Sequence, residues 1–364
     1  MRDERKFLYE RVYDSLKKDI LSGAIKGNDL LPSEKDIADK FEVDRTTVRK
    51  ALGMLVDEGL VEKRAGVGTR VVMRHYQPDA GNNYRTIGFL LPRSKNKADR
   101  ITQPFYSSLF YRVEAECRKK GFSLIYTTLD EEDDIFQVIE AHRLSGVIFL
   151  TNVSKRILQQ AIDAKVPSIL VNGFHEDMTS VLGNNNDGAY KAIRHLAELG
   201  HKRIALIKGI DGYVTCYERF EGCCKAAKEF GISFDQTDVF DGNWEYDGGY
   251  EGARKIFLGR ESYPTALFAF NDMMAIGAIK ALMEMGKSVP DDVSVVGFDN
   301  EYAAAFKHLI PQLTTMDVNI KTMATIAADS IVSRIENEGA YRIKIETPVD
   351  LVIGETSKQL SKGK

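Results

Sequence analysis

Residues 33–52 read SEKDIADKFEVDRTTVRKAL, and this stretch decides the fold of the first part of the chain. Its pattern of apolar and polar residues predicts two short helices joined by a turn at residues 41–43. Asp44 is expected to cap the second helix, because its carboxylate can accept a hydrogen bond from a backbone N–H near Thr47. The residues at helical spacing that should face a core are Val48, Ala51, Leu52, Leu55 and Val56.

The opposite face of the second helix carries side chains that can contact nucleic acid. Arg45, Thr46, Arg49 and Lys50 supply two guanidiniums, a hydroxyl and an ammonium. A cationic face on the second helix of such a pair suits insertion into a DNA major groove. Mixed charges also occur on solvated helix faces, so the stretch alone leaves both interpretations open.

The flanking sequence predicts another helix before this pair and a hairpin after it. The first helix should run from about residue 7 to residue 22, and Ser33 with Asp36 forms a capping-box pattern. Residues 60–64 and 69–72 read as two strands around a turn that contains Gly66 and Gly68. Glycines there permit positive φ and a close approach to a phosphate or a minor-groove edge. Three helices and a hairpin make a winged helix-turn-helix.

The composition is that of an ordinary soluble globular protein, with 364 residues, 43% hydrophobic and 28% charged. The net charge of −3 hides an asymmetry: residues 1–76 hold 16 Lys and Arg against 14 Asp and Glu, whereas the remainder holds 34 against 39. There is no signal-peptide pattern and no long apolar run, and the four cysteines lack metal-binding spacing. We therefore expect a cytoplasmic protein with no membrane partner, no cofactor and no metal.

The rest of the chain alternates short apolar runs with amphipathic segments. The strand-like runs are 87–91, 123–127, 146–150, 168–171, 203–208, 266–269 and 293–298. The helix-like segments are 107–120, 155–164, 188–199, 219–230 and 275–285. Buried strands separated by helices predict an α/β fold with parallel sheets, here in two lobes. A ligand is expected at the carboxyl ends of the strands, in the cleft between the lobes.

The first part of the chain resembles the GntR family of bacterial transcription regulators over about residues 6–73. The resemblance rests on LPSE at 31–34, on the pattern FxVxRxTVRxAL at 41–52, and on Gly59-Leu60 and GVGT at 66–69. It implies that Lys35 contacts the DNA backbone, that Arg45 and Arg49 reach guanine edges or phosphates, and that Gly66 places the wing in the minor groove. The expected DNA-binding residues are Ser33, Lys35, Arg45, Thr46, Thr47, Arg49, Lys50, Gly66 and Gly68. Asp44 replaces the family's usual Ser or Thr and should weaken binding unless it acts purely as a cap.

The remainder resembles the effector-binding domain of LacI/GalR-type repressors, which is itself similar to periplasmic sugar-binding proteins. The resemblance covers about residues 85–355 and rests on LGHKRIA at 199–205, VPDDVSVVGFD at 289–299 and PQLTT at 311–315. It implies an effector pocket formed by Phe105, Tyr106, Arg219, Trp244, Asn271 and Asp299. Each of these also has a plain structural alternative, such as a surface arginine, a turn aspartate or a core tryptophan.

Two features depart from the sugar-binding members of that family. Asn172-Gly173 follows the strand at 168–171, where many relatives have an arginine, so the sequence names no specific sugar. The segment from residue 93 to residue 103 is longer than usual, and its Lys95, Lys97 and Arg100 are expected to be solvated.

These observations predict four regions: a GntR-type winged-helix DNA-binding domain at 1–73, a linker at 74–86, a LacI/GalR-like effector-binding domain of two lobes at 87–357, and a disordered tail at 358–364. The combination resembles the AraR group of arabinose repressors. It implies a homodimeric, ligand-responsive repressor of a carbohydrate operon that binds double-stranded operator DNA, with a small sugar such as arabinose as effector.

Three alternatives stay open at this point. The effector could be a nucleobase or another metabolite, or the chain could be a cytosolic sugar-binding protein without operator binding. An enzyme acting on a sugar is the third, although the sequence has no nucleophile elbow, phosphate-binding loop or HExxH motif. The acidic run at 130–134 is expected to be a solvated loop and not a pair of catalytic carboxylates.

Overall fold

The computed structural model describes residues 7–21, 24–25, 28–64, 66–72, 84–93, 99–302, 310–337 and 342–360. The chain divides into two compact units. The first comprises Met1–Tyr84, Asp130–Ser145 and Val153–Pro167, and the second comprises Arg85–Leu129, Gly146–Asn152 and Ser168–Lys364. Most of the predicted linker and the last four residues of the predicted tail lie outside the described residues. The prediction of disorder is wrong for residues 358–360, because the Lys358 backbone N–H donates to the Ser294 hydroxyl at 3.1 Å and the Leu360 N–H donates to the Leu199 carbonyl at 2.8 Å. Among the described residues, no helix has the length and apolar character needed to cross a membrane.

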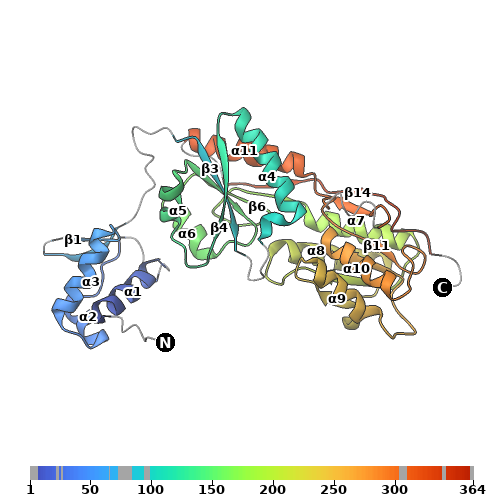
Figure 1. Cartoon of the computed structure of the whole chain (residues 1–364), viewed down its shortest axis with the longest axis horizontal. Coiled ribbons are helices and arrows are strands. Elements are labelled where there is room, and N and C mark those ends of the chain that lie inside the picture. Colours follow the sequence, from blue (N-terminus) through green and yellow to red (C-terminus); the bar gives the residue numbers. More distant parts are fainter. Residues whose placement is uncertain are drawn as a thin grey trace. The chain divides into compact units, whose positions relative to one another are not determined.

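The N-terminal part of the first unit is a winged helix-turn-helix, as the sequence predicts (Figure 1). Its elements are α1 (Leu8–Leu21), α2 (Glu34–Phe41), α3 (Arg45–Asp57), β1 (Val61–Arg64) and β2 (Gly68–Val71). The two strands pair antiparallel and form the wing. The core is built from one face of each helix and the inner side of the wing, by Val12, Leu16, Ile37, Val48, Leu52, Leu55, Val61 and Val71 among others.

Both predicted helix caps are confirmed. Ser33 caps α2 in a reciprocal capping box with Asp36, and Asp44 caps α3 by accepting a hydrogen bond from the Thr47 backbone. One predicted core residue is wrong, because Val56 is 37% exposed. It lies about 100° around α3 from the fully buried Leu55, beyond the face that packs on α1 and α2.

The first unit also holds α5 (Ile135–His142) and α6 (Lys155–Asp163). The Arg156 guanidinium donates hydrogen bonds to the carbonyls of Glu131 and Asp133, so the acidic run before α5 is tied down through its backbone. Asp134 caps α5 and is only 6% exposed, which contradicts its predicted place in a solvated loop. Its carboxylate accepts a hydrogen bond from the Phe136 backbone N–H in the first turn of the helix at 3.0 Å.

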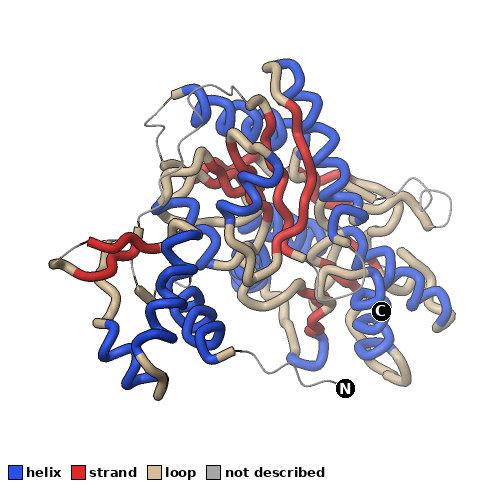
Figure 2. The backbone as a smooth tube through the Cα atoms, turned by 60° about the vertical axis from the view of Figure 1, so that its left-hand side comes forward, coloured by secondary structure: helices blue, strands red, loops and turns tan. Residues whose placement is uncertain are grey.

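The second unit contains two parallel sheets, the α/β arrangement expected from the sequence (Figure 2). The larger sheet has the order β13-β7-β6-β5-β3-β4 and the smaller has the order β11-β10-β8-β9. The strands of the larger sheet are β3 (Thr86–Pro92), β4 (Ser123–Leu129), β5 (Gly146–Leu150), β6 (Ser168–Val171), β7 (Ser180–Gly183) and β13 (Lys344–Thr347). Those of the smaller sheet are β8 (Ile204–Lys208), β9 (Val239–Asp241), β10 (Ala266–Ala269) and β11 (Ser294–Val296).

Helices pack beside these sheets in pairs. The pairs are α4 (Pro104–Lys119) with α11 (Ile320–Glu336), α7 (Asn185–Glu198) with α8 (Val214–Phe230), and α9 (Tyr246–Phe257) with α10 (Asp272–Glu284) (Figure 1). Two short antiparallel strands, β12 (Thr315–Asp317) and β14 (Asp350–Val352), form a further two-stranded sheet. The lobe of the larger sheet is called lobe A below, and the lobe of the smaller sheet lobe B.

Candidate functional site

The N-terminus of α3 presents the predicted DNA-contacting side chains to solvent. Arg45, Thr46 and Arg49 are exposed, as is Lys35 on α2. The Asp44 carboxylate accepts hydrogen bonds from Thr47 at its backbone N (2.8 Å) and its hydroxyl (3.2 Å). The bond from the Thr47 backbone is the main reason why the pKa of Asp44 lies below its usual value. Asp44 therefore bears a negative charge at the start of α3.

Four of the predicted DNA-binding side chains already have partners within the winged helix-turn-helix, which is called the head (residues 8–71). The Ser33 hydroxyl donates to Asp36 at 2.7 Å, and the Thr47 hydroxyl donates to Asp44. The Lys50 ammonium lies over the Tyr9 ring, 3.6 Å from its centre. Arg49 donates from Nε to the carboxylate of Glu34 at 2.8 Å. Of these four, Ser33 and Lys50 have clear structural roles, so they are the weakest members of the predicted set.

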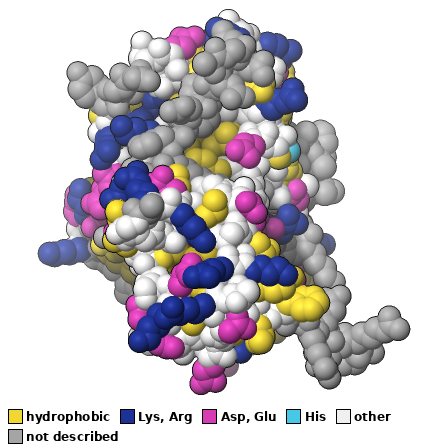
Figure 3. Space-filling model, turned by 90° about the vertical axis from the view of Figure 1, so that its left-hand side faces the viewer, with side chains coloured by type: hydrophobic (Ala, Val, Ile, Leu, Met, Phe, Trp, Pro, Cys, Tyr) yellow, Lys and Arg dark blue, Asp and Glu magenta, His cyan; other side chains and the backbone are white. Residues whose placement is uncertain are grey.

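The wing turn has the backbone that the sequence predicts. Gly66 has φ of 76° and Gly68 has φ of 125°, in a region that side chains with a Cβ rarely adopt. A Cβ at Gly66 would meet no atom within 4 Å, so its backbone is openly accessible. On the face seen in Figure 3, Lys and Arg side chains lie next to Asp and Glu side chains, so this face is mixed in charge and not uniformly basic.

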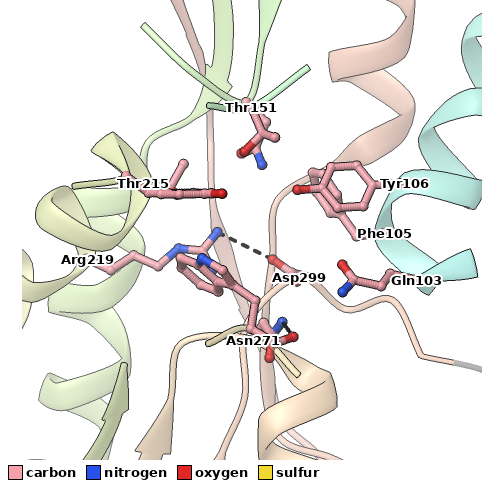
Figure 4. Close-up of a pocket in the computed structure, with 11 residues that line it drawn as sticks. Gln103, Phe105, Tyr106, Thr151, Thr215, Arg219, Asn271 and Asp299 are labelled. Atoms are coloured by element: carbon pink, nitrogen blue, oxygen red, sulfur yellow. Dashed lines mark hydrogen bonds and ion pairs between the residues drawn. The ribbon is translucent and has the colours of Figure 1, made fainter. Parts of the chain in front are cut away.

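A pocket in the second unit brings together all six residues predicted to bind an effector (Figure 4). It contains about 370 Å³ of space, including the part open to solvent. The lining residues are Phe105, Tyr106, Arg219, Trp244, Asn271 and Asp299 together with Gln103, Thr151, Asn172, Tyr213 and Thr215.

The pocket lies where strands of both lobes end. Thr151 follows β5 and Asn172 follows β6 in lobe A, while Asn271 and Asp299 come after β10 and β11 in lobe B. The backbone φ is 54° at Thr151, 57° at Asn172, 68° at Trp244 and 114° at Asp299. Non-glycine residues in such conformations carry strain and concentrate at functional sites. Four of the eleven lining residues therefore have a backbone that marks the pocket as a candidate binding site.

Arg219 is the central cation of the pocket and is only 4% exposed. Its Nε donates to the Asn185 side chain at 2.9 Å, one terminal nitrogen donates to the Phe270 carbonyl, and the other lies 3.4 Å from Asp299. Its guanidinium also lies 3.6 Å from the centre of the Phe298 ring. Burial lowers the pKa of Arg219, and the charge of Asp299 opposes that shift. These contacts fix the guanidinium while leaving some of its N–H groups for a ligand.

Two buried carboxylates share this one arginine. Burial raises the pKa of Asp299 to about 7, despite the opposing effect of Arg219. Asp272, which is fully buried behind it, has a pKa raised well above its usual value by burial and by the charge of Asp299. The Asp272 carboxylate accepts hydrogen bonds from the Thr315 hydroxyl (2.5 Å) and the Glu301 backbone (2.8 Å). Because one cation cannot balance two buried anions, this cluster holds a proton near neutral pH.

Asn271 contributes to the pocket mainly by holding Trp244. Its Oδ1 accepts a hydrogen bond from the Met274 backbone and caps α10, while its Nδ2 donates to the Trp244 carbonyl at 2.9 Å. The Trp244 ring packs against Gly209, where a Cβ would overlap it. The indole Nε1 is buried and has no hydrogen-bond partner among the residues that the structure describes.

Three hydrogen bonds join the two lobes around the pocket. Arg100 donates to the Tyr213 hydroxyl at 2.9 Å, Gln103 donates to Glu245 at 2.9 Å, and Ser108 donates to Glu301 at 3.0 Å. The prediction that Arg100 is merely solvated is therefore wrong, whereas Lys95 and Lys97 lie outside the described residues. Arg100 is half-buried because the 3₁₀ turn Arg100–Thr102 brings it against the aromatic rings of the pocket.

Comparison with known proteins agrees with this two-part organisation. Residues 8–71 match the family described as "Bacterial regulatory proteins, gntR family", and residues 193–357 match the "Periplasmic binding protein-like domain". The chain joins a gntR-type head to a periplasmic-binding-protein-like domain. The gntR match ends at the last strand of the wing, and the second match includes four of the six predicted pocket residues, from Arg219 to Asp299.

Curated relatives of similar length are named as repressors. The chain is 28% identical over 341 residues to "HTH-type transcriptional repressor PurR" of Mannheimia succiniciproducens, covering 90% of this chain and 99% of the relative. The PurR of Vibrio atlanticus is 29% identical over 343 residues, with the same shares covered.

Solved structures share the fold. A LacI family regulator of Enterococcus faecium with bound ribose is 27% identical, with a TM-score of 0.66, and covers 76% of this chain and 100% of its own. The complex of the transcriptional regulator CelR with cellobiose covers 97% of this chain and 100% of its own, with a TM-score of 0.69. At 22% identity the likeness to CelR concerns the fold alone.

Five lining residues of this periplasmic-binding-protein-like pocket are absent from the predicted set, although the sequence marks Asn172 as standing where many relatives have an arginine. Thr151 and Asn172 follow predicted strands, so the rule that selected Asn271 could also have found them. Thr215 and Tyr213 were missed because α8 begins at Val214, five residues before the predicted start of that helix. Gln103 lies just before the Pro104 that opens α4, and nothing in its local sequence distinguishes it.

Proposed function

We propose that this chain is a ligand-responsive transcription repressor whose head binds operator DNA and whose pocket binds a small, neutral, hydroxyl-rich effector. One observation carries the proposal: six residues selected from separate parts of the sequence meet around a single pocket, in a chain whose residues 8–71 match the gntR family. The curated relatives, which are named repressors and match this chain over 99% of their own length, support the proposal.

A sugar is the effector class that the lining favours. A sugar hydroxyl both donates and accepts, so neighbouring hydroxyls can accept from Arg219 and donate to Asp299 at the same time. The Thr151, Asn172 and Thr215 side chains can serve further hydroxyls, and the aromatic rings offer apolar faces. Relatives with ribose and cellobiose bound belong to the same fold. Within this class, an aldopentose such as arabinose is the first candidate, because the regulator of Enterococcus faecium that is 27% identical to this chain has the aldopentose ribose bound.

A nucleobase is the second candidate, because four aromatic side chains line the pocket and can stack on a planar ring. These are Phe105, Tyr106, Tyr213 and Trp244. The curated relatives named PurR give this candidate a second reason for testing.

A thermal-shift panel separates the two effector classes. The full chain is melted with arabinose, ribose, xylose, glucose and cellobiose in one arm, and with adenine, guanine and hypoxanthine in the other. A ligand at 100 times its dissociation constant stabilises the folded protein by about 2.7 kcal/mol, which is several degrees of midpoint. A rise in the melting midpoint with a pentose, abolished by Asp299→Asn, supports a sugar effector. A rise with a nucleobase alone replaces the sugar by a nucleobase as the effector class. No rise in either arm rejects both classes.

The DNA-binding function has its own test. A random duplex library is enriched with the wild-type protein, and binding of the selected sequence is compared with that of an Arg45→Ala, Arg49→Ala double variant. We expect the variant to lose selective binding and the wild type to bind more weakly as salt rises, because phosphate contacts release counterions. Selective binding that survives the double substitution rejects the recognition-helix assignment. A wild type that enriches no sequence leaves a ligand-binding protein without operator binding.

We also propose the division into a head at 1–73, a linker at 74–86, an effector domain at 87–357 and a tail at 358–364. The gntR match ending at residue 71 and the start of β3 at Thr86 support these boundaries. The repressor acts in the cytoplasm as a homodimer, whose effector domains place two recognition helices one helical turn apart on a pseudo-palindromic operator. Light scattering of the full chain, with a dimer mass expected, tests the assembly.

A further inference from the structure

One carboxylate in the head lies between the recognition helix and the wing. Glu34 is the first residue of α2, directly after the cap Ser33. Its Oε2 accepts a hydrogen bond from Arg49 Nε in α3 at 2.8 Å, and its Oε1 lies 3.9 Å from Lys63 Nζ in β1. Three elements that are separate in the sequence are therefore joined electrostatically through one side chain.

The contact leaves the outer edge of Arg49 available. Glu34 takes the Nε hydrogen, whereas the two terminal nitrogens of Arg49 keep their hydrogens, and 64% of the side chain is exposed. Bidentate reading of guanine needs two N–H groups in a fixed fork. A long arginine side chain held at Nε has fewer orientations of that fork than a free one, so the contact preorganises it.

Stability is a poor explanation for the contact. Arg49 is mostly exposed, Lys63 is 48% exposed, and exposed ion pairs contribute little to folding. A carboxylate at this position also costs attraction to the DNA backbone, because it partly neutralises two cations that could otherwise contact phosphates. A residue that lowers general attraction while orienting a base-reading group favours selectivity.

We propose that Glu34 is a positioning residue of the operator-binding site: it orients Arg49 for base readout and restrains Arg49 and Lys63 from indiscriminate phosphate contact. The inference rests on the proposed function of the head as an operator-binding domain. Glu34 itself touches no base in this scheme. It raises the ratio of selective to non-selective binding and lowers the non-selective affinity.

The test measures that ratio with the full chain. The probes are the duplex enriched by the wild type from a random library and a scrambled duplex of the same length and composition. Glu34→Ala should lower the ratio of the two affinities about 5-fold or more, which is the loss of one bidentate base contact. It should also tighten binding to the scrambled duplex, because Arg49 and Lys63 become available to phosphates. The slope of log affinity against log salt should then steepen by up to about one for each of these two cations that gains a phosphate contact.

Two further variants separate orientation from charge and from folding. Glu34→Gln keeps an oxygen that can accept from Arg49 Nε, so it should retain most of the wild-type ratio. Asp39→Ala removes one negative charge from the exposed side of the same helix and should leave the ratio unchanged. Equal loss in Asp39→Ala and Glu34→Ala, or an unchanged ratio in Glu34→Ala, overturns the inference. If the wild type enriches no sequence, the operator-binding proposal itself fails and this inference falls with it.

Discussion

Replacing Gly209 by alanine should disable the pocket through a single tryptophan. Gly209 follows β8, and its φ lies outside the left-handed region, so the backbone accepts alanine. The added Cβ, however, would overlap the Cζ2, Cε2 and Cη2 atoms of Trp244. All three lie well inside the 3.4 Å at which ordinary van der Waals contact begins, so the ring must move by at least about 1 Å.

The surroundings of Trp244 restrict where its ring can move. Its carbonyl is held by Asn271, so the main chain cannot simply retreat from Gly209. The open direction for the ring is the pocket that it lines. Overpacking of this kind typically costs about 1–3 kcal/mol of folding free energy. A ring displaced into the ligand's space should lower effector affinity at least tenfold, which is about 1.4 kcal/mol.

The assay is direct because Trp244 is the only tryptophan of the chain. Gly209→Ala should shift the tryptophan emission maximum of the ligand-free protein and abolish the emission change that effector produces in the wild type. Gly53→Ala is the matched control, since a Cβ there meets no atom within 4 Å. If Gly209→Ala keeps both the wild-type emission spectrum and the wild-type effector affinity, the packing of Trp244 on Gly209 does not position the ring.

Further predictions concern two carboxylates, Asp299 in the pocket and Asp44 at the start of α3. Asp299 binds its proton more tightly in the folded chain than in the unfolded one, so its contribution to the free energy of unfolding should fall as pH rises from about 4 to about 7. The half-buried His195 and the buried His201 have lowered pKa values and act in the opposite sense, so the measured quantity is the difference between wild type and Asp299→Asn across that range. A sugar hydroxyl that donates to Asp299 requires the ionised carboxylate, so the affinity for the sugar should rise from about pH 4 to about pH 7. Calorimetric titration at several pH values tests this, and an affinity that does not change with pH contradicts it. In the head, Asp44→Ser should keep the cap of α3 within a few tenths of a kcal/mol and tighten DNA binding, whereas Asp44→Ala should destabilise the head by about 1 kcal/mol; equal DNA affinity in the wild type and Asp44→Ser would show that this charge has no effect.

The fold was predictable where local patterns coincide with buried faces. Strands β5, β6 and β10 have the predicted bounds, because continuous apolar runs bounded by turns read clearly as buried parallel strands. The helices α5, α9 and α11 and the short strands β7, β9 and β12–β14 went unpredicted. Three of the seven buried residues of α11 are alanines, and its apolar periodicity is weak. Three-residue strands such as β9 are too short to show any periodicity.

The site was predictable as a set of residues and not as a set of contacts. Motifs led to Arg219, Asn271 and Asp299. Nothing in the sequence shows, however, that the Asn271 side chain donates to the Trp244 carbonyl and accepts from the Met274 backbone to cap α10. The same holds for the bonds that join the two lobes, which link residues more than 100 positions apart, such as Arg100 and Tyr213. Side-chain pairing at such separation depends on the folded geometry, which local spacing does not encode.

Strained backbone and buried charge at the pocket can supply the free energy by which an effector favours one conformation of the lobes over another. An effector can shift the state of a repressor only by its difference in affinity for two conformations, typically about 1–3 kcal/mol. Backbone strain of the kind seen at Thr151 and Asp299 costs about 1–3 kcal/mol per residue, and Asp299 also holds a buried charge with one shared cation. A ligand that bonds these groups stabilises the conformation in which both lobes contribute them, and it gains little where the lobes are apart. Strain and buried charge at the meeting of the two lobes are thus sufficient in size to couple ligand binding to a change between the lobes.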